Sequence, residues 1–173
     1  MKRSSNKGFT LVELLVVVAI IAICTAIMEA SLSTLSSSQA HECANEIGSL
    51  LSQCRIRAMS RSANVYLKLY QDASGNLRAD YVENNAVVSS DAVGGTRCGA
   101  SYTAGGVETP LDSSGRALYL SFARDTGAFR TLQPDGINDA ASPCTSIEVS
   151  GGGCIYTVSF YLATGLYRIE VST

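Results

Sequence analysis

Residues 9–28 form one apolar run in which Glu13 is the only charged side chain. As a helix rising about 1.5 Å per residue, this run would be about 30 Å long, which is the thickness of a bilayer's hydrocarbon core. An ionised carboxylate inside a bilayer costs roughly 2.5–3.5 kcal/mol, so such residues usually have a partner and a function. The run therefore predicts a membrane-spanning helix with a functional acid near its start.

Two other kinds of amino-terminal segment fit the run less well. A secretory signal peptide has a shorter apolar core with a small-residue cleavage site after it, and no A-x-A follows this run. A lipoprotein signal needs a small residue before its cysteine, whereas Ile23 precedes Cys24. Lys2, Arg3 and Lys7 stand ahead of the run with no acid among them, which places the amino end in the cytoplasm.

The remainder of the chain is acidic and long enough for one domain. The chain has 173 residues, too few for two domains with full cores. Its net charge is −2, and three of its cations precede the apolar run, so the part beyond the membrane is more acidic still. Because phosphate contacts need local positive charge, that part is a poor general binder of nucleic acid.

The boundary "KG|FTLVE" resembles the leader of a type IV prepilin or pseudopilin. Such leaders are short and basic, end in Gly, and are followed by Phe and by a glutamate as the fifth mature residue. Gly8, Phe9 and Glu13 occupy these positions. The resemblance implies cleavage after Gly8 by a prepilin peptidase on the cytoplasmic side, and methylation of the new amino group of Phe9 by the same enzyme.

The resemblance also implies a role for Glu13 in assembly. In filaments of this family the fifth-residue carboxylate is thought to pair with the first-residue amine of a neighbouring subunit. A carboxylate in a low dielectric favours a cation nearby, and the pairing would set the axial register between subunits. The alternative is a lone glutamate at the cytoplasmic edge of an ordinary anchor, reaching to water.

Residues 29–62 are expected to form a second, amphipathic helical region. It opens with the serine-rich "ASLSTLSSSQ", whose low helix propensity suggests a loosened segment. Ala30 stands where many pilins have a proline, so the sequence departs from that pattern. Apolar residues then recur at three- and four-residue steps, which predicts one buried helix face. The stripe consists of Ala40, Cys43, Ala44, Ile47, Leu50, Leu51, Cys54 and Ala58.

Residues 63–173 are expected to form a β-rich domain outside the membrane. Alternating strands flank turn residues in three places, which predicts three hairpins. The paired segments are 65–70 with 77–82, 117–123 with 129–132, and 155–162 with 166–171. Residues 91–106 and 135–144 are rich in Gly, Ser and Ala and are expected to be loops. The prediction is an α+β fold of the pilin kind, with a long helix packed on an antiparallel sheet.

A second resemblance concerns the junction between helix and first strand. The segment "CRIRAMSRSANVYLKL" looks like the corresponding junction of GspH/FimT-type minor pilins and pseudopilins, with matches at Arg55, Ala58, Arg61 and Val65. Arg57 stands where a glutamate is usual. The closing "TGLYRIEV" resembles the final hairpin of the same group.

Catalysis and cofactor binding have no support in the sequence. The only histidine, His41, is two residues from Cys43, and residues two apart on a helix point in different directions. No phosphate-binding glycine loop, HExxH or CxxC motif occurs, so neither a metal nor another cofactor is expected. The chain is predicted to be the substrate of an enzyme rather than an enzyme.

Five cysteines lie outside the apolar run: Cys43, Cys54, Cys98, Cys144 and Cys154. Cys144 and Cys154 flank a glycine-rich segment and are the easiest local disulfide pair. Cys43 and Cys54 share a helix face but are about 16 Å apart, too far for one bond. Either of them could link the helix to the loop carrying Cys98, or all five could be buried thiols.

DNA is a further partner to consider, because some FimT-like pilins carry G-R-x-R at the final turn. Residues 165–168 read Gly-Leu-Tyr-Arg, so the first arginine is missing. Arg55, Arg57 and Arg61 have a structural reason to cluster, because cations stabilise the carboxyl end of a helix. The sequence thus disfavours DNA binding.

The prediction is a minor pilin or pseudopilin of a type IV pilus or type II secretion filament. It would sit in the cytoplasmic membrane with its amino end inside, lose residues 1–8, and polymerise with other pilin subunits through residues 9–28. It would then lie at the cell surface or in the cell envelope. A major pilin, and a single-pass anchored binding protein that never polymerises, are the alternatives.

Overall fold

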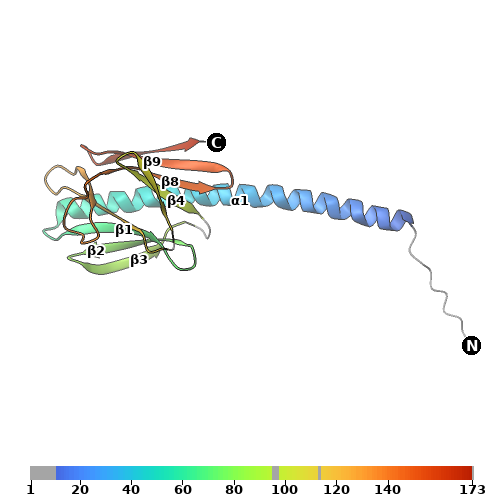
Figure 1. Cartoon of the computed structure of the whole chain (residues 1–173), viewed down its shortest axis with the longest axis horizontal. Coiled ribbons are helices and arrows are strands. Elements are labelled where there is room, and N and C mark those ends of the chain that lie inside the picture. Colours follow the sequence, from blue (N-terminus) through green and yellow to red (C-terminus); the bar gives the residue numbers. More distant parts are fainter. Residues whose placement is uncertain (1–10, 95–97, 113, 173) are drawn as a thin grey trace, which may run out of the picture.

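The computed structural model describes residues 11–94, 98–112 and 114–172, and of residues 27–36 it describes the backbone alone. A single long helix, α1 (Leu11–Ser60), precedes a series of strands (Figure 1). The first five strands are β1 (Val65–Gln71), β2 (Leu77–Glu83), β3 (Ala86–Ala92), β4 (Gly99–Ala104) and β5 (Val107–Leu111). The others are β6 (Ala117–Phe122), β7 (Phe129–Leu132), β8 (Cys144–Gly151), β9 (Cys154–Tyr161) and β10 (Leu166–Ser172).

α1 runs without interruption through the serine-rich segment. The prediction of a loosened segment at residues 30–39 is therefore wrong, because the backbone there is helical. Neither Gly nor Pro occurs between residues 9 and 47, and a serine in a helix costs only about 0.5 kcal/mol relative to alanine. Within residues 11–60, the two predicted regions thus form one unbroken helix and differ in the arrangement of their apolar residues.

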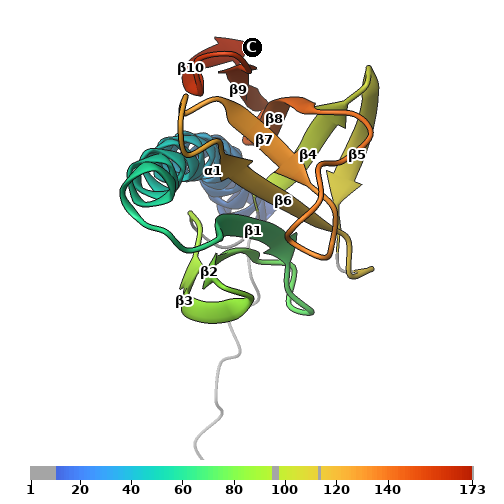
Figure 2. The ribbon, with the colours of Figure 1, turned by 90° about the vertical axis from the view of Figure 1, so that its left-hand side faces the viewer.

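The strands form two antiparallel sheets that share the second half of α1. One sheet has the order β3-β2-β1-β6-β7 and the other has the order β10-β9-β8-β4-β5. Viewed along the helix, the two sheets lie on different sides of α1 and curve around it (Figure 2). α1 contacts β1 and β6 of the first sheet and β8, β9 and β10 of the second. The expected α+β, pilin-like fold is confirmed.

The three predicted hairpins are present, and one predicted loop is not. β1 pairs with β2, β6 with β7 and β9 with β10. Residues 91–106, expected to be a loop, contain β4, which pairs with β5 and β8. The weak strand propensity of its small residues is overridden because β4 completes the second sheet. Residues 135–143 lie outside the named strands, with one isolated bridge between Leu132 and Asp139.

The core lies between α1 and the two sheets. The predicted stripe on residues 40–58 is buried with the exception of Leu50, which is partly exposed. Ile47 and Leu51 are the largest stripe residues buried almost completely. They share one core with sheet residues such as Leu120 and Ile147. We call residues 40–58 the packed half of α1, and the packed half together with the strands the head.

The final hairpin is fitted closely to the packed half. Gly48 lies in the middle of the helix, and a Cβ atom there would stand 2.8 Å from the Tyr167 ring. The Tyr167 hydroxyl is 3.2 Å from Ser52 Oγ. A glycine inside a helix costs about 1 kcal/mol relative to alanine, and here its missing side chain admits β10.

Candidate functional site

Residues 11–26 of α1, which we call the exposed half, are the candidate site. Every side chain from residue 11 to residue 26 is exposed, and most of them are apolar. The exposure ranges among the large apolar residues from 80 % at Leu11 to 48 % at Val17. Figure 1 shows this half of α1 projecting away from the head. The head therefore leaves these apolar side chains uncovered.

An apolar helix of this kind requires an apolar environment supplied from outside the chain. Burying a Val, Leu or Ile side chain stabilises by about 1.5–3 kcal/mol, so leaving a run of them in water is costly. A surface helix normally has one apolar stripe, whereas residues 11–26 are apolar around the whole circumference. Large uncovered apolar surfaces mark contacts with membranes or with other proteins.

Polar groups of the exposed half are arranged compatibly with such an environment. The Thr25 hydroxyl bonds back to the helix, 3.1 Å from the Ile21 carbonyl oxygen and 2.9 Å from that of Ala22. This contact satisfies the hydroxyl without water, as is required in a hydrocarbon phase. Glu13 lies in the first turn of α1, where the positive end of the helix dipole favours a carboxylate.

The remaining residues of the predicted processing site lie outside the described part of the chain. Gly8 and Phe9, and with them the leader, precede the first described residue. Among the described residues, no helix has both the length and the apolar character needed to cross a membrane. The predicted span, residues 9–28, begins before the described helix and ends where side chains are not described.

Comparison with known proteins agrees with the location of this site. Residues 3–28 match the prokaryotic N-terminal methylation motif. Together with the α+β fold, the motif indicates a type IV prepilin-like protein, a class of structural subunits and not of enzymes. The match covers the leader and the apolar run and leaves the head uncompared. Neither a curated protein nor a solved structure matches the chain.

The three arginines near the end of α1 all make contacts within the head. Arg55 Nη2 donates to the Thr164 carbonyl at 2.9 Å, in the turn between β9 and β10. The Arg57 guanidinium lies 4.4 Å from the centre of the Tyr81 ring. Arg61 forms an ion pair with Glu83. These contacts support the structural interpretation of the cluster over a DNA-binding one.

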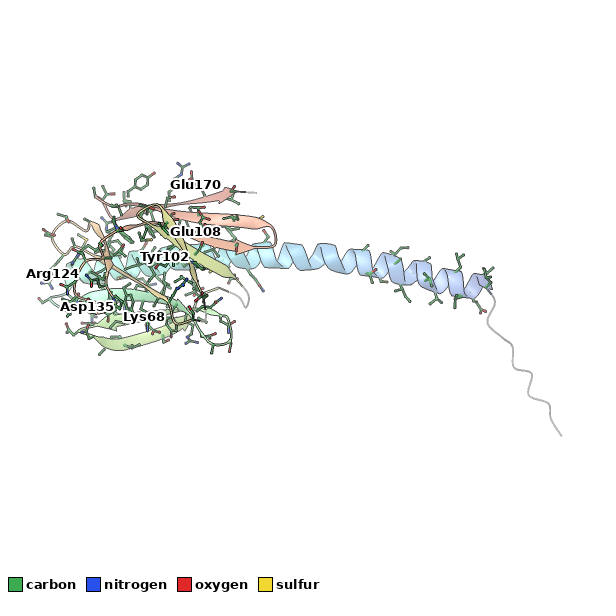
Figure 3. The ribbon with its side chains drawn as sticks, viewed as in Figure 1. Lys68, Tyr102, Glu108, Arg124, Asp135 and Glu170 are labelled. Carbon is green, nitrogen blue, oxygen red and sulfur yellow. The ribbon has the colours of Figure 1, made fainter. Side chains whose placement is uncertain are left out.

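The final turn gives DNA no clear cationic site either. Arg168 Nη2 is 2.9 Å from the carboxylate of Glu170 two residues later. Figure 3 shows Glu170 on the outer strand of the second sheet. The charge of the one arginine that remains from the G-R-x-R pattern is thus partly balanced within its own strand.

His41 and Cys43 point in different directions, as their spacing predicts. His41 is exposed, with its ring centre 5.3 Å from that of Tyr156 and Nε2 3.1 Å from Asn45 Nδ2. Cys43 is buried in the core. Within the described residues, no group of His, Cys, Asp or Glu is placed to hold a metal ion.

The structure does not bring Cys144 and Cys154 together. Both are free thiols at the starts of neighbouring strands, and Cys154 pairs with Gly151 at the far end of β8. With about 3.3 Å per strand residue, the two cysteines are roughly 20 Å apart. The predicted pair is therefore wrong, because residues 145–151 form a strand and not a flexible loop. The alternative of Cys43 with Cys98 is the pairing that the fold brings into contact.

A polar hollow at the other end of the head was not predicted. It is lined largely by polar residues from the α1–β1 connection, the β2–β3 turn and the β6–β7 hairpin, among them Asn64, Asn84, Arg124 and Arg130. Figure 3 shows Arg124 at the end of the head farthest from the exposed half. Arg130 is held by Asp139 at 2.8 Å. These residues are far apart in the sequence, so no local pattern predicts the hollow.

Proposed function

We propose that this chain is a minor pilin or pseudopilin of the GspH/FimT kind, a subunit of a type IV pilus or type II secretion filament. The observation that carries the proposal is the exposed half of α1, which lies within the residues that match the N-terminal methylation motif. The chain would be anchored in the cytoplasmic membrane and cut after Gly8 by prepilin peptidase. Phe9 would then be methylated, and the subunit would pass into the filament.

The exposed half would be covered first by lipid and then by the helices of neighbouring subunits. Both environments are apolar, so the transfer leaves the side chains buried at each stage. The Glu13 carboxylate would pair with the amino group of Phe9 on a neighbour. Since an unpaired charge in such a medium is costly, only one axial register would satisfy both groups. The head would then form the outer surface of the filament.

The test is incorporation of a Glu13→Ala variant into filaments sheared from cells. Removing one partner of a buried ion pair costs about 3–5 kcal/mol, so incorporation should fall at least about tenfold. Glu42→Ala is the matched control, because Glu42 is an exposed acid on the packed half of the same helix. Unchanged incorporation of Glu13→Ala would contradict the role of Glu13 in register. Absence of the wild-type chain from the filaments would favour an anchored binding protein.

Processing is measured on the wild-type chain in the same filaments. Cleavage at glutamate should release residues 9–13 as one peptide that begins at Phe9 and carries an added methyl group. Its abundance relative to other subunits would separate a minor from a major pilin. An uncut chain beginning at Met1 and confined to membranes would contradict the proposal.

A further inference from the structure

Val93 and Gly94, which follow β3, lie against α1 near the start of the packed half. Val93 is buried, and the amide of Gly94 donates to a carboxylate oxygen of Glu46 at 2.7 Å. A Cβ atom on Gly94 would lie only 2.5 Å from the Cβ atom of Cys43. The backbone at Gly94 therefore packs directly against Cys43.

Cys98 immediately precedes β4 and meets Cys43 from the sheet side. Cys43 is fully buried and Cys98 is 3 % exposed, and both belong to the same core cluster. The two side chains are neighbours, close enough for each to shift the pKa of the other. Two neighbouring cysteines buried in the same core need only a local adjustment to reach the distances of a disulfide.

We propose that Cys43 and Cys98 form a disulfide that joins α1 to the second sheet. The proposal rests on the proposed function only for the compartment, because a head outside the cytoplasm folds in an oxidising environment. The bond would lie where α1 enters the head. A filament subunit pulled through its helix is loaded at this point, so the bond would resist separation of helix and sheet.

The other buried cysteines are placed differently. Cys54 lies on the same helix about 16 Å further along. Cys144 donates to the carbonyl oxygen of Ser146 at 3.4 Å, within its own strand. The fold therefore singles out Cys43 and Cys98 among the cysteines of the head.

The bond forms by exchange with an external disulfide, such as that of an oxidoreductase or of glutathione. One cysteine thiolate attacks the external disulfide, forming a mixed disulfide and releasing one thiol. The second cysteine then attacks the mixed disulfide, which forms the Cys43–Cys98 bond and releases a second thiol. The two protein protons leave with the released thiols, and the external disulfide takes up the two electrons.

Burial decides when this exchange takes place. It raises the pKa of both thiols, so in the folded head they stay in the protonated form that does not attack a disulfide. Because both sulfur atoms are covered in the folded head, the bond is expected to form while the chain folds.

The first experiment refolds the purified full chain in detergent with oxidised and reduced glutathione and maps its cysteines. Cleavage at Glu, Arg and Lys places the five cysteines of the head on five different peptides. The expected product joins Cys-Ala-Asn-Glu (residues 43–46) to the peptide of residues 98–108. Recovery of these two peptides only as separate, alkylated thiols would overturn the proposal.

The second experiment measures thermal unfolding with and without reductant. Closing a loop of this length should raise the melting temperature by about 10 °C, and reductant should remove the increase. Cys43→Ser and Cys98→Ser should each abolish the effect of reductant, whereas Cys54→Ser should retain it. An effect of reductant that persists in Cys98→Ser would overturn the assignment.

Protein taken from cells separates this proposal from the proposed function. Thiols are alkylated at lysis, before the chain is digested. A joined peptide in cells supports both the pair and the exported location of the head. Refolded protein that forms the bond, with cellular protein in which both thiols are alkylated, would contradict the exported location and leave the geometry of the pair supported.

Discussion

The two halves of α1 belong to one continuous helix and yet differ in whether the head covers their apolar side chains. In the exposed half, apolar residues surround the helix and none of the described side chains is buried. In the packed half, they are confined to a stripe, and both sheets cover that stripe. The apolar side chains of the packed half are thus covered by the chain's own sheets, whereas those of the exposed half require other molecules to cover them.

The difference shows that helix formation and helix burial are separate properties of this sequence. The backbone is helical from Leu11 to Ser60, whatever covers the side chains. Only the arrangement of apolar residues around the circumference changes, from all sides to one side. Substitutions in the packed half should therefore affect folding of the head, and those in the exposed half should affect insertion and assembly.

The largest effect is expected from placing a charge in each half. Ile47→Asp puts a carboxylate into a fully buried position and should cost at least about 4 kcal/mol, much of the stability of an ordinary domain. Val17→Asp should leave the melting temperature of the head within about 2 °C of wild type. It should reduce membrane insertion instead, because a central carboxylate costs about 3 kcal/mol there.

Thermal unfolding of the full chain in detergent and membrane fractionation measure the two effects. Ser49→Asp is the matched control, since Ser49 is an exposed residue of the packed half close to Ile47. It should change neither quantity appreciably. A head that melts earlier in Val17→Asp would show that the two halves are coupled.

A second prediction concerns the turn that closes over the end of the packed half. Gly165 has φ +65°, and a Cβ atom there would lie 1.9 Å from the Gly127 carbonyl oxygen. Gly165→Ala should destabilise the head by about 3 kcal/mol, because the two turns must separate. Gly153→Ala provides the control, since Gly153 also has positive φ (+83°) but nothing within 4 Å.

Gly153→Ala should cost only about 1 kcal/mol, from backbone conformation alone. Chemical denaturation of the two variants compares them directly. Equal losses would mean that the close approach of the turns at residues 127 and 165 does not stabilise the end of the packed half.

A third prediction uses the thiol of Cys54 in the packed half. Burial raises the pKa of this thiol from 9.0 to about 12. The folded head therefore keeps its proton at a pH where the unfolded chain has lost it, and stability falls as the pH rises above 9.0. The loss attributable to Cys54 should reach up to about 2 kcal/mol at pH 10.5.

Denaturation between pH 8 and pH 10.5 tests this dependence. Cys54→Ala should be less stable at pH 8, because a small cavity remains, but its stability should fall less steeply with pH. Cys24→Ala, in the exposed half, should show the wild-type slope. Parallel slopes for wild type and Cys54→Ala would show that Cys54 does not report on the packing of the helix.

Periodicity was sufficient to predict the packed half of the helix, its buried stripe and three hairpins, but not the unbroken course of α1 through residues 30–39. These features depend on neighbouring residues, so they can be read from a short window. The candidate site was likewise predictable, because the motif at Gly8, Phe9 and Glu13 and the apolar run are contiguous in the sequence.

The missed features depend on partners distant in the sequence. β4 consists mostly of small and polar residues and is a strand because β5 and β8 lie beside it. The local pairing of Cys144 with Cys154 fails because residues 144–151 form a strand, which depends on its neighbours in the second sheet. The contact between Cys43 and Cys98 was one of several alternatives, and only the tertiary fold selects it.

The smallest effect is expected at the ion pair of Arg61 and Glu83, which follows the last turn of α1. The Arg61 side chain is 51 % exposed and that of Glu83 is 20 % exposed, so solvent and salt screen the attraction. Arg61→Ala, Glu83→Ala and the double variant should give a coupling energy of about 0.5–1 kcal/mol that decreases in high salt. A coupling above about 2 kcal/mol that persists in high salt would mean that this junction is held in place by charge. The attachment of the helix end would then depend on the Arg61–Glu83 ion pair as well as on the apolar stripe. The stripe alone would not explain why the packed half is covered by the sheets and the exposed half is not.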